Sequence, residues 1–294
     1  MEIIPDINQK KRYSGEIRIY PYLRDHHLES KTILPAVESM MILARAVKLN
    51  YPRSNVHHIR QAAFLRFLYI PQDVTDQPVF VDMDPSEDGV ITASLRTSLK
   101  SKTGNITREI EHARACFITT RAEETSAFPF HVVNPRKGTY IAIPSTTAYR
   151  ELIPFGVAYQ NIVGDLSLTT EDALAYISGG RYEADESLLG SPFPLDAVMH
   201  LASVWGQRFA DVVSFPVGIE KRIIYRKTRK GREYFGRVAP VHVTPEYLVF
   251  DAWIYDEGIL CERISGLKMM DVTGGRLRPP EWIREGQSLA IDRR

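Results

Sequence analysis

The sequence predicts an α+β fold made of two tandem units, each an antiparallel sheet with a long apolar helix. Two segments, Ala36–Val47 and Leu195–Val212, are apolar nearly all round, which is typical of buried helices. Four strand-like segments, separated by turn-forming residues, follow each of them. This order of elements repeats at a spacing of about 160 residues, so we expect the second half to fold like the first.

Composition and charge bound the class of protein. With 44% hydrophobic and 25% charged residues, the 294-residue chain is long enough and apolar enough to bury a full core. A net charge of +1 argues against a protein that binds nucleic acid mainly by charge. No signal peptide is recognisable and no segment approaches the roughly 18 apolar residues of a membrane span, so we expect a cytoplasmic protein that does not enter membranes.

The sequence gives no sign of a metal centre or a disulfide framework. Cys116 and Cys261 stand alone without CxxC spacing, and both lie in strand-like segments, which favours buried free thiols. His57 and His58 lie in a polar connection without acidic neighbours at metal-ligand spacing. We therefore expect no bound metal.

We assign residues 1–125 to the first unit. Its first 14 residues form a polar lead-in, and Pro35 suits the first position of the helix, where its missing N–H costs nothing. Polar turns at 84–89 and 100–105 separate the later strands. The predicted strands are Gly15–Leu23, Ala62–Ile70, Val79–Asp84, Val90–Leu99 and Arg108–Thr119.

Residues 126–148 are rich in turn formers and lack periodicity, so we assign them to a linker. The second unit covers 149–275, with its helix beginning after Pro194, and a tail follows at 276–294. The strands predicted for the second unit are Ile162–Leu168, Ala173–Ile177, Val217–Lys227, Arg232–Ala239, Tyr247–Tyr255 and Leu260–Val272.

Each predicted helix carries reactive polar residues near its beginning. His26 precedes the first apolar helix, at the edge of an interior where its basicity can be controlled, and that is a place for proton transfer. Asp196 lies at the beginning of the second helix, and His200 follows four residues later on the same face. Asp196 is also a common residue at helix beginnings, so an ordinary capping role stays open.

These residues match two known motifs. His26, Ser30 and Pro35 have the spacing HxxxGxxxxP, with serine at the glycine position, and Asp196 and His200 fit DxxxQ/H. Both motifs resemble the active-site motifs of dehydratase domains from polyketide synthases and related fatty-acid synthases. Three further stretches look like landmarks of that family. They are Pro154–Asn161, which resembles the YGPxF segment, Phe215–Glu220 and Gly258–Val272, so the resemblance covers residues 15–275.

The resemblance implies a double hot-dog fold with the active site between the two halves. It also implies removal of water from a 3-hydroxyacyl thioester, with His26 as the base for the C2 proton and Asp196 as the acid for the 3-hydroxyl. His200 would orient Asp196, and the backbone N–H of Ser30 would bind the thioester oxygen. The substrate would arrive on the phosphopantetheine arm of an acyl carrier protein, without any further cofactor.

The implied chemistry raises one difficulty, at Asp196, and the sequence departs from the family pattern at Ser30 and Phe155. A helix N-terminus favours the ionised form of Asp196, whereas an acid must keep its proton, so desolvation has to outweigh the helix dipole. Ser30 costs roughly 1–3 kcal/mol if that residue needs a positive φ. Phe155 replaces the tyrosine that leads the YGPxF segment, so a hydroxyl is lost, and Gly156 follows it. Tyr159, in place of that segment's phenylalanine, is the candidate to replace the hydroxyl.

A basic segment offers a second kind of site. Seven basic residues and no acidic ones lie between Lys221 and Arg232. Either they form a solvated hairpin, or Arg226, Arg229 and Lys230 dock an acidic carrier protein. Other synthase domains and a second copy of the chain remain open as partners.

Three function classes follow from the sequence. The leading one is a dehydratase that forms a 2-enoyl thioester. The second is a double-bond isomerase or polyketide cyclase on the same fold, and the third is a catalytically silent module that binds acyl chains, which Ser30 and Phe155 would suit. Analysis of the products separates the first two, and absence of turnover would identify the third.

Overall fold

The structure, a computed structural model, describes residues 9–100, 107–118, 140–182 and 188–285. In the first half it contains the strands β1 (Lys11–Arg18), β2 (His27–Leu28), β3 (Lys31–Thr32), β4 (His58–Phe64), β5 (Asp76–Pro85), β6 (Val90–Lys100) and β7 (Thr107–Ile118). The helices of that half are the 3-10 helix η1 (Pro21–Asp25) and the α-helix α1 (Ala36–Asn50).

The second half begins with β8 (Ile141–Pro144), the short helices α2 (Ser145–Thr147), η3 (Ala148–Leu152) and η4 (Val157–Tyr159), and the strands β9 (Ile162–Leu168) and β10 (Ala173–Ser178). It continues with α3 (Phe193–Phe209), β11 (Phe215–Ile224), β12 (Glu233–Val243), β13 (Leu248–Asp256), β14 (Ile259–Met270) and α4 (Glu281–Glu285).

The strand order repeats between the halves. The large sheet has the order β1-β5-β6-β7-β4-β11-β14-β13-β12-β10-β9-β8. In each half the first strand after the long helix pairs with the fourth, the third and second follow, and the strand before the helix pairs with the second. The predicted repeat is therefore present in the topology.

The prediction of two separate sheets is wrong, because β4 and β11 pair antiparallel and join the halves into one twelve-stranded sheet. Both strands would otherwise expose an unpaired edge, which proteins avoid. The residues that meet include Ala63 opposite Gly218 and Ile59 opposite Arg222. The two halves consequently share a continuous backbone hydrogen-bond network.

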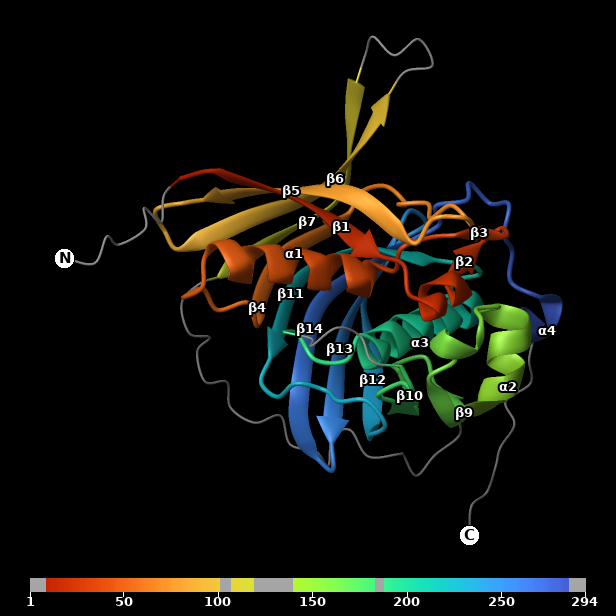
Figure 1. The fold of residues 1–294 in the computed structure, drawn as a ribbon. Helices are drawn as coiled ribbons and strands as arrows, with labels where there is room; N and C mark the ends of the chain where they lie inside the picture. Colours follow the sequence, from red (N-terminus) through yellow and green to blue (C-terminus); the bar gives the residue numbers. More distant parts are fainter. Residues whose placement is uncertain (1–8, 101–106, 119–139, 183–187, 286–294) are drawn as a thin grey trace.

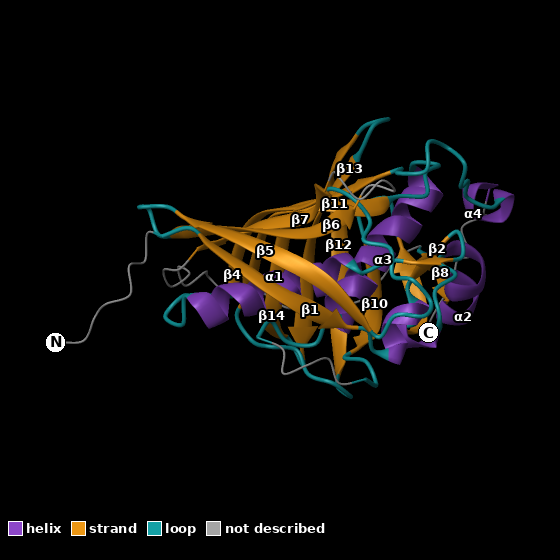
Figure 2. Ribbon diagram, turned by 45° about the horizontal axis from the view of Figure 1, so that its top comes forward, coloured by secondary structure: helices purple, strands orange, loops and turns teal. Residues whose placement is uncertain are grey.

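The two long helices lie on the sheet and touch each other. α1 contacts β6 and β7, α3 contacts β10 and β12, and α1 also contacts α3 (Figure 1). Every residue of α3 from Phe193 to Gln207 is buried, as its almost entirely apolar sequence predicted. The short helices α2 and α4 lie at the same end of the molecule as β2 and the edge strand β8 (Figure 2).

Several boundaries differ from the sequence predictions for local reasons. β1 begins at Lys11, within the predicted lead-in, and ends at Arg18, because Pro21 starts η1 and has no N–H for a strand ladder. β4 begins before the predicted strand Ala62–Ile70 and ends at Phe64, just after Gln61 adopts a φ of 48°. Pro35 caps α1 instead of occupying its first position.

The end of the predicted linker belongs to the second half. Ile141–Pro144 forms β8 and pairs with β9, so residues 141–148 add an edge strand and two short helical segments to that half. The predicted linker residues 126–139 lie outside the described residues. The predicted tail contains α4, whose Ile283 is buried against α3.

In the part of the chain that the structure describes, no helix is long and apolar enough to cross a membrane.

Candidate active site

His26 is held by the chain that immediately follows it. Its backbone carbonyl accepts a hydrogen bond from the Ile33 N–H at 3.0 Å, and its Nδ1 lies 3.2 Å from the Ile33 carbonyl oxygen. A carbonyl can only accept, so Nδ1 carries the proton in this contact. The remaining ring nitrogen, Nε2, is then the basic atom of a side chain that is 9% exposed.

A tight hairpin brings the two ends of this contact together. β2 and β3 pair antiparallel and are joined by Glu29 and Ser30, whose φ values of 47° and 65° are typical of a type I′ turn. Asparagine and glycine are the usual residues in such turns. Ser30 therefore does occupy the positive-φ position at which the sequence comparison places glycine, and it bears the corresponding backbone cost.

Asp25 ties the His26 loop to the second half of the chain. Its carbonyl oxygen accepts from the Gly156 N–H, and its Oδ2 accepts from the Ala158 N–H, both at 2.8 Å. A methyl group on Gly156 would lie 2.6 Å from the Asp25 Cβ and Oδ1, so only glycine permits this approach. Gly156 thus acts through backbone geometry, which explains its place in the predicted site.

Two aromatic rings enclose His26. The Phe155 ring stacks on its imidazole at a centroid distance of 4.4 Å, and the Tyr159 ring meets it edge-on at 5.0 Å. Tyr159 is fully buried, and its hydroxyl has no hydrogen-bond partner among the described residues. Tyr159 therefore contacts His26 through its ring, and its hydroxyl forms no hydrogen bond with a described residue of the site.

A tyrosine that the sequence analysis missed, Tyr149, brings a hydroxyl to His200. Its hydroxyl oxygen accepts hydrogen bonds from the N–H groups of Asn161 and Ile162, both at 2.9 Å. With both lone pairs used, the hydroxyl proton can only point to His200 Nδ1, 3.3 Å away. His200 therefore accepts at Nδ1 and carries its own proton on Nε2.

The Nε2 proton of His200 faces Asp196. His200 Nε2 lies 3.1 Å from Asp196 Oδ2, in an alignment that falls short of a hydrogen bond, so the attraction is mainly electrostatic. The two residues are one turn apart on α3, and each is 4% exposed. The predicted pairing on one helix face is present, and Tyr149 extends it into a chain of three side chains.

Burial controls the protonation of two groups in the site. Desolvation lowers the pKa of His26 to about 4, although the nearby Asp196 carboxylate opposes this change. His26 is therefore neutral and able to accept a proton near pH 7. Burial also raises the pKa of Tyr149, which keeps its hydroxyl protonated as a donor to His200.

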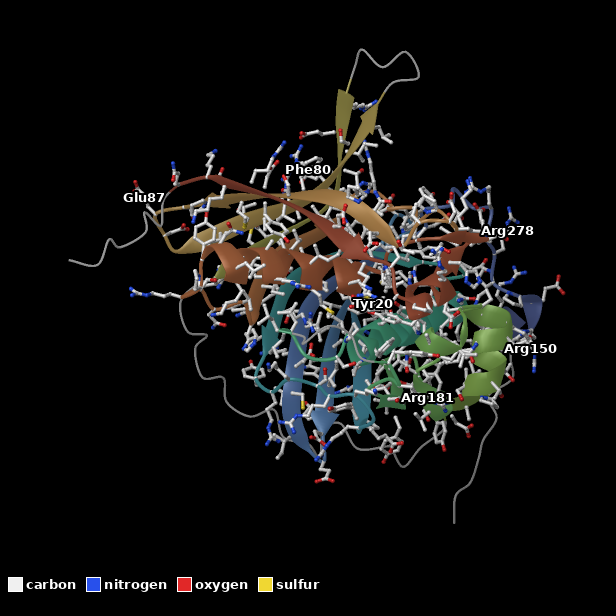
Figure 3. All side chains as sticks on the ribbon, in the orientation of Figure 1. Tyr20, Phe80, Glu87, Arg150, Arg181 and Arg278 are labelled. Atoms are coloured by element: carbon white, nitrogen blue, oxygen red, sulfur yellow. The ribbon has the colours of Figure 1, made fainter. Side chains whose placement is uncertain are left out.

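His26 and Asp196 face a common cavity of about 1130 Å³. The cavity runs along one face of α3 and reaches the exposed residues Arg66 and Arg278, the latter visible at the surface in Figure 3. Of the predicted site residues, His26, Ser30, Phe155, Asp196 and His200 line this cavity. Pro35, Gly156 and Tyr159 are not among the residues that line it.

The basic segment is placed differently. Arg222 is buried and donates from Nε and Nη2 to Glu262 Oε2, at 2.9 and 2.8 Å, so it is not part of a surface patch. Arg226, Arg229 and Lys230 are exposed but do not line the cavity. Their role in carrier docking stays a prediction. In the described ranges no three His, Cys, Asp or Glu side chains gather as metal ligands would.

Comparison with known proteins identifies the fold. No model of a protein family and no curated protein matches the sequence. Among solved structures, a dehydratase domain of a trans-AT polyketide synthase from Brevibacillus brevis is similar, with a TM-score of 0.70 and 17% identity over 89% of this chain and 93% of that domain. The dehydratase domain from the CurF module of curacin polyketide synthase gives 0.70 and 18% over 92% and 95%.

A further similar structure is an inactive mutant of the CurK dehydratase, in which phenylalanine replaces a histidine. Its TM-score is 0.70 and its identity 18%, over 92% of this chain and 94% of that one. At such identities the likeness establishes the fold, and the fold is the double hot-dog of these dehydratase domains.

Proposed function

We propose that the protein is a dehydratase that removes water from a 3-hydroxyacyl thioester to give a 2-enoyl thioester. The observation that carries this proposal is the placement of a neutral histidine from the first half and a carboxyl group from the second on one cavity. β-Elimination needs such a pair, one group for each end of the bond that becomes a double bond.

The proposed step conserves atoms and electrons. His26 Nε2 takes the proton from C2, the electron pair of that C–H bond forms the C2=C3 bond, and the C3–O bond breaks. Asp196 gives its proton to the departing hydroxyl, which leaves as water. No oxidant or reductant is consumed. The Ser30 N–H, at the hairpin turn beside the cavity, is the proposed donor to the thioester oxygen.

The acid role of Asp196 requires it to hold a proton in spite of two neighbours that favour its anion. These are the beginning of α3 and the Nε2–H of His200. The nearly complete burial of Asp196 acts in the opposite direction, because removing a carboxylate from water disfavours its charge. Proton transfer from His26 to Asp196 after each turnover would restore both groups.

The relatives of known structure support this assignment. They are dehydratase domains of polyketide synthases, and the CurK protein was crystallised as an inactive mutant lacking one histidine. We propose, by analogy, that His26 is essential in this chain, that α1 and α3 are the central helices of the two hot-dog units, and that the substrate is carried on the phosphopantetheine of an acyl carrier protein. Arg278, exposed at the cavity, would suit the phosphate of that arm.

The test is incubation with a panel of 3-hydroxyacyl thioesters, followed by mass spectrometry for loss of water. We expect the wild-type chain to give 2-enoyl products, and His26→Ala and Asp196→Asn each to lower kcat at least about a hundredfold, as loss of a general acid or base does. Tyr176→Phe, at an exposed tyrosine of β10, is the control variant, and its activity should equal that of the wild type. A product of unchanged mass but shifted double bond or closed ring would replace the proposal with isomerisation or cyclisation.

A further inference from the structure

Polar side chains lie on the cavity wall beyond Asp196, where an acyl chain would be expected to need an apolar surface. Met199, Ser203 and Gln207 continue the α3 face that carries Asp196 and His200. Ser203 and Gln207 follow Asp196 by seven and eleven residues, which places them roughly 10 and 16 Å farther along the helix axis. A chain bound along α3 would pass both side chains.

These side chains have unused hydrogen-bonding capacity. Ser203 is 9% exposed, lines the cavity, and has no hydrogen-bond partner among the described residues. Gln207 is fully buried and donates from Nε2 to the Leu152 carbonyl at 3.1 Å, but its Oε1 is without a partner in the same part of the chain. Native proteins pair nearly all such buried atoms, so each exception calls for an explanation.

A third unpaired group lies at the same end of the cavity. Ser214 is 2% exposed, lines the cavity, and its Oγ finds no partner within the described residues. It is close to Gly206, the residue before Gln207, since a Cβ on that glycine would lie 3.3 Å from the Ser214 Oγ. Ser203, Gln207 and Ser214, which we call the Ser203 cluster, therefore gather around the C-terminal half of α3.

Another polar pair on the cavity wall shows the contrast. His112 accepts from the Thr97 hydroxyl at 2.7 Å through Nε2, because its Nδ1 donates to the Arg66 carbonyl at 3.2 Å. Both Thr97 and His112 are buried, and they satisfy each other. Among the described residues, the members of the Ser203 cluster form no such hydrogen bonds with one another.

We propose that the Ser203 cluster is a second binding site within the cavity, which takes a hydroxyl or amide group of the thioester substrate. This rests on the proposed function. Two parts of the substrate supply that chemistry. One is an oxygen substituent on the acyl chain. If the chain is extended, it lies about eight carbons beyond C3, because each C–C bond of about 1.5 Å advances the zigzag chain by only about 1.25 Å along its axis. The other is the amide-bearing pantetheine arm. A plain acyl chain on N-acetylcysteamine lacks both the oxygen substituent and the rest of the pantetheine arm.

The experiment uses four substrates and the complete chain. Plain and hydroxylated 3-hydroxyacyl chains are each prepared as N-acetylcysteamine and as pantetheine thioesters, and kcat/KM is measured for the wild type, Ser203→Ala and Gln207→Met. We expect one of the two groups to raise the wild-type kcat/KM about tenfold, the value of one good hydrogen bond. In Ser203→Ala that ratio should fall to about one.

Which group gives the advantage identifies the source, and either result supports the site. Ser54→Ala, a buried serine whose hydroxyl donates to the Tyr51 carbonyl outside the cavity, should keep the wild-type ratio. If neither group gives an advantage, or if Ser203→Ala lowers kcat/KM equally for all four substrates, the site is refuted.

Calorimetry separates this proposal from the proposed function. Saturated acyl thioethers of N-acetylcysteamine and of pantetheine, each with and without the hydroxyl on the acyl chain, can bind but cannot lose water. The same group preference in their dissociation constants, lost in Ser203→Ala, would support the Ser203 cluster even if no dehydration were seen. Dehydration without any preference would leave the proposed function intact and overturn the cluster.

Discussion

The contact between Gly156 and Asp25 gives the sharpest test of how the site is built. In Gly156→Ala the added methyl group would lie 2.6 Å from the Asp25 Cβ and Oδ1, closer than real Cβ atoms approach other atoms. Gly156 has a φ of −66°, so alanine is allowed by the backbone and the effect is purely steric. Asp25 must move, and it precedes the proposed base His26 directly.

The size of the effect follows from two costs. Overpacking a well-filled site destabilises by about 1–3 kcal/mol, which we expect as the loss of unfolding free energy in urea. A displacement of His26 by about 1 Å costs on the order of a hundredfold in rate, because proton transfer depends on the geometry of attack. We expect kcat to fall by this factor when dehydration of a model 3-hydroxyacyl thioester is followed by absorbance of the enoyl product.

A double mutant decides whether the steric explanation is right. Asp25→Gly removes the Cβ and the carboxylate that clash and also the acceptor for the Ala158 N–H, so it has a cost of its own, about 1–2 kcal/mol. Without the Asp25 side chain, the alanine at 156 fits, and the double mutant should behave like Asp25→Gly alone. If its losses in kcat and stability equal the sum of the single losses, the two residues act independently and the reasoning fails.

Three further predictions concern the groups around this contact. Tyr149→Phe leaves two buried N–H groups without an acceptor and should lower the free energy of unfolding in urea by roughly 2–4 kcal/mol. It should also lower kcat more than it raises KM. An unchanged kcat would exclude Tyr149 from positioning His200. Burial lowers the folded-state pKa of His26 from 6.5 to about 4, so the unfolded chain takes up this proton first. The unfolding free energy of the wild type minus that of His26→Phe should therefore be largest above pH 6.5 and should decrease by on the order of 3 kcal/mol as the pH falls to about 4. A difference that does not change with pH would contradict this prediction. Ser30→Gly removes the cost of a φ of 65° and should raise the unfolding free energy by about 1 kcal/mol, whereas a loss of stability would show that the serine side chain contributes contacts of its own.

The placement of His26 and Asp196 on one cavity could be predicted from the sequence because His26 shortly precedes one buried helix and Asp196 lies near the beginning of the other. His26 precedes α1 by ten residues, and Asp196 and His200 are one turn apart on α3. Such local spacings survive folding unchanged. The positive φ of Ser30 was foreseeable for the same reason, since a single motif position required it.

Tyr149 could not be predicted in this way. Its partner His200 is 51 residues away, and Tyr149 directly follows the segment 126–148, which the sequence suggested to be a linker. The joining of β4 to β11 escaped prediction as well, because alternating residues indicate a strand but not its neighbour. In the basic segment, only the structure distinguishes Arg222, which faces Glu262 in the interior, from the exposed arginines beside it.

Because the proposed base and acid come from different halves, their separation depends on the join between the halves. The β4–β11 pairing fixes the two sheets relative to each other, and the hydrogen bonds from Asp25 to Gly156 and Ala158 fix the His26 loop locally. Phe155 lies between these elements, with its ring 4.4 Å from His26 and 5.2 Å from His200. Its ring keeps the two imidazoles apart and excludes water from the space between them, which preserves the neutral state of His26. Phe155, which the sequence presents as the loss of a hydroxyl, is therefore a spacer here, while Tyr149 brings a hydroxyl to His200.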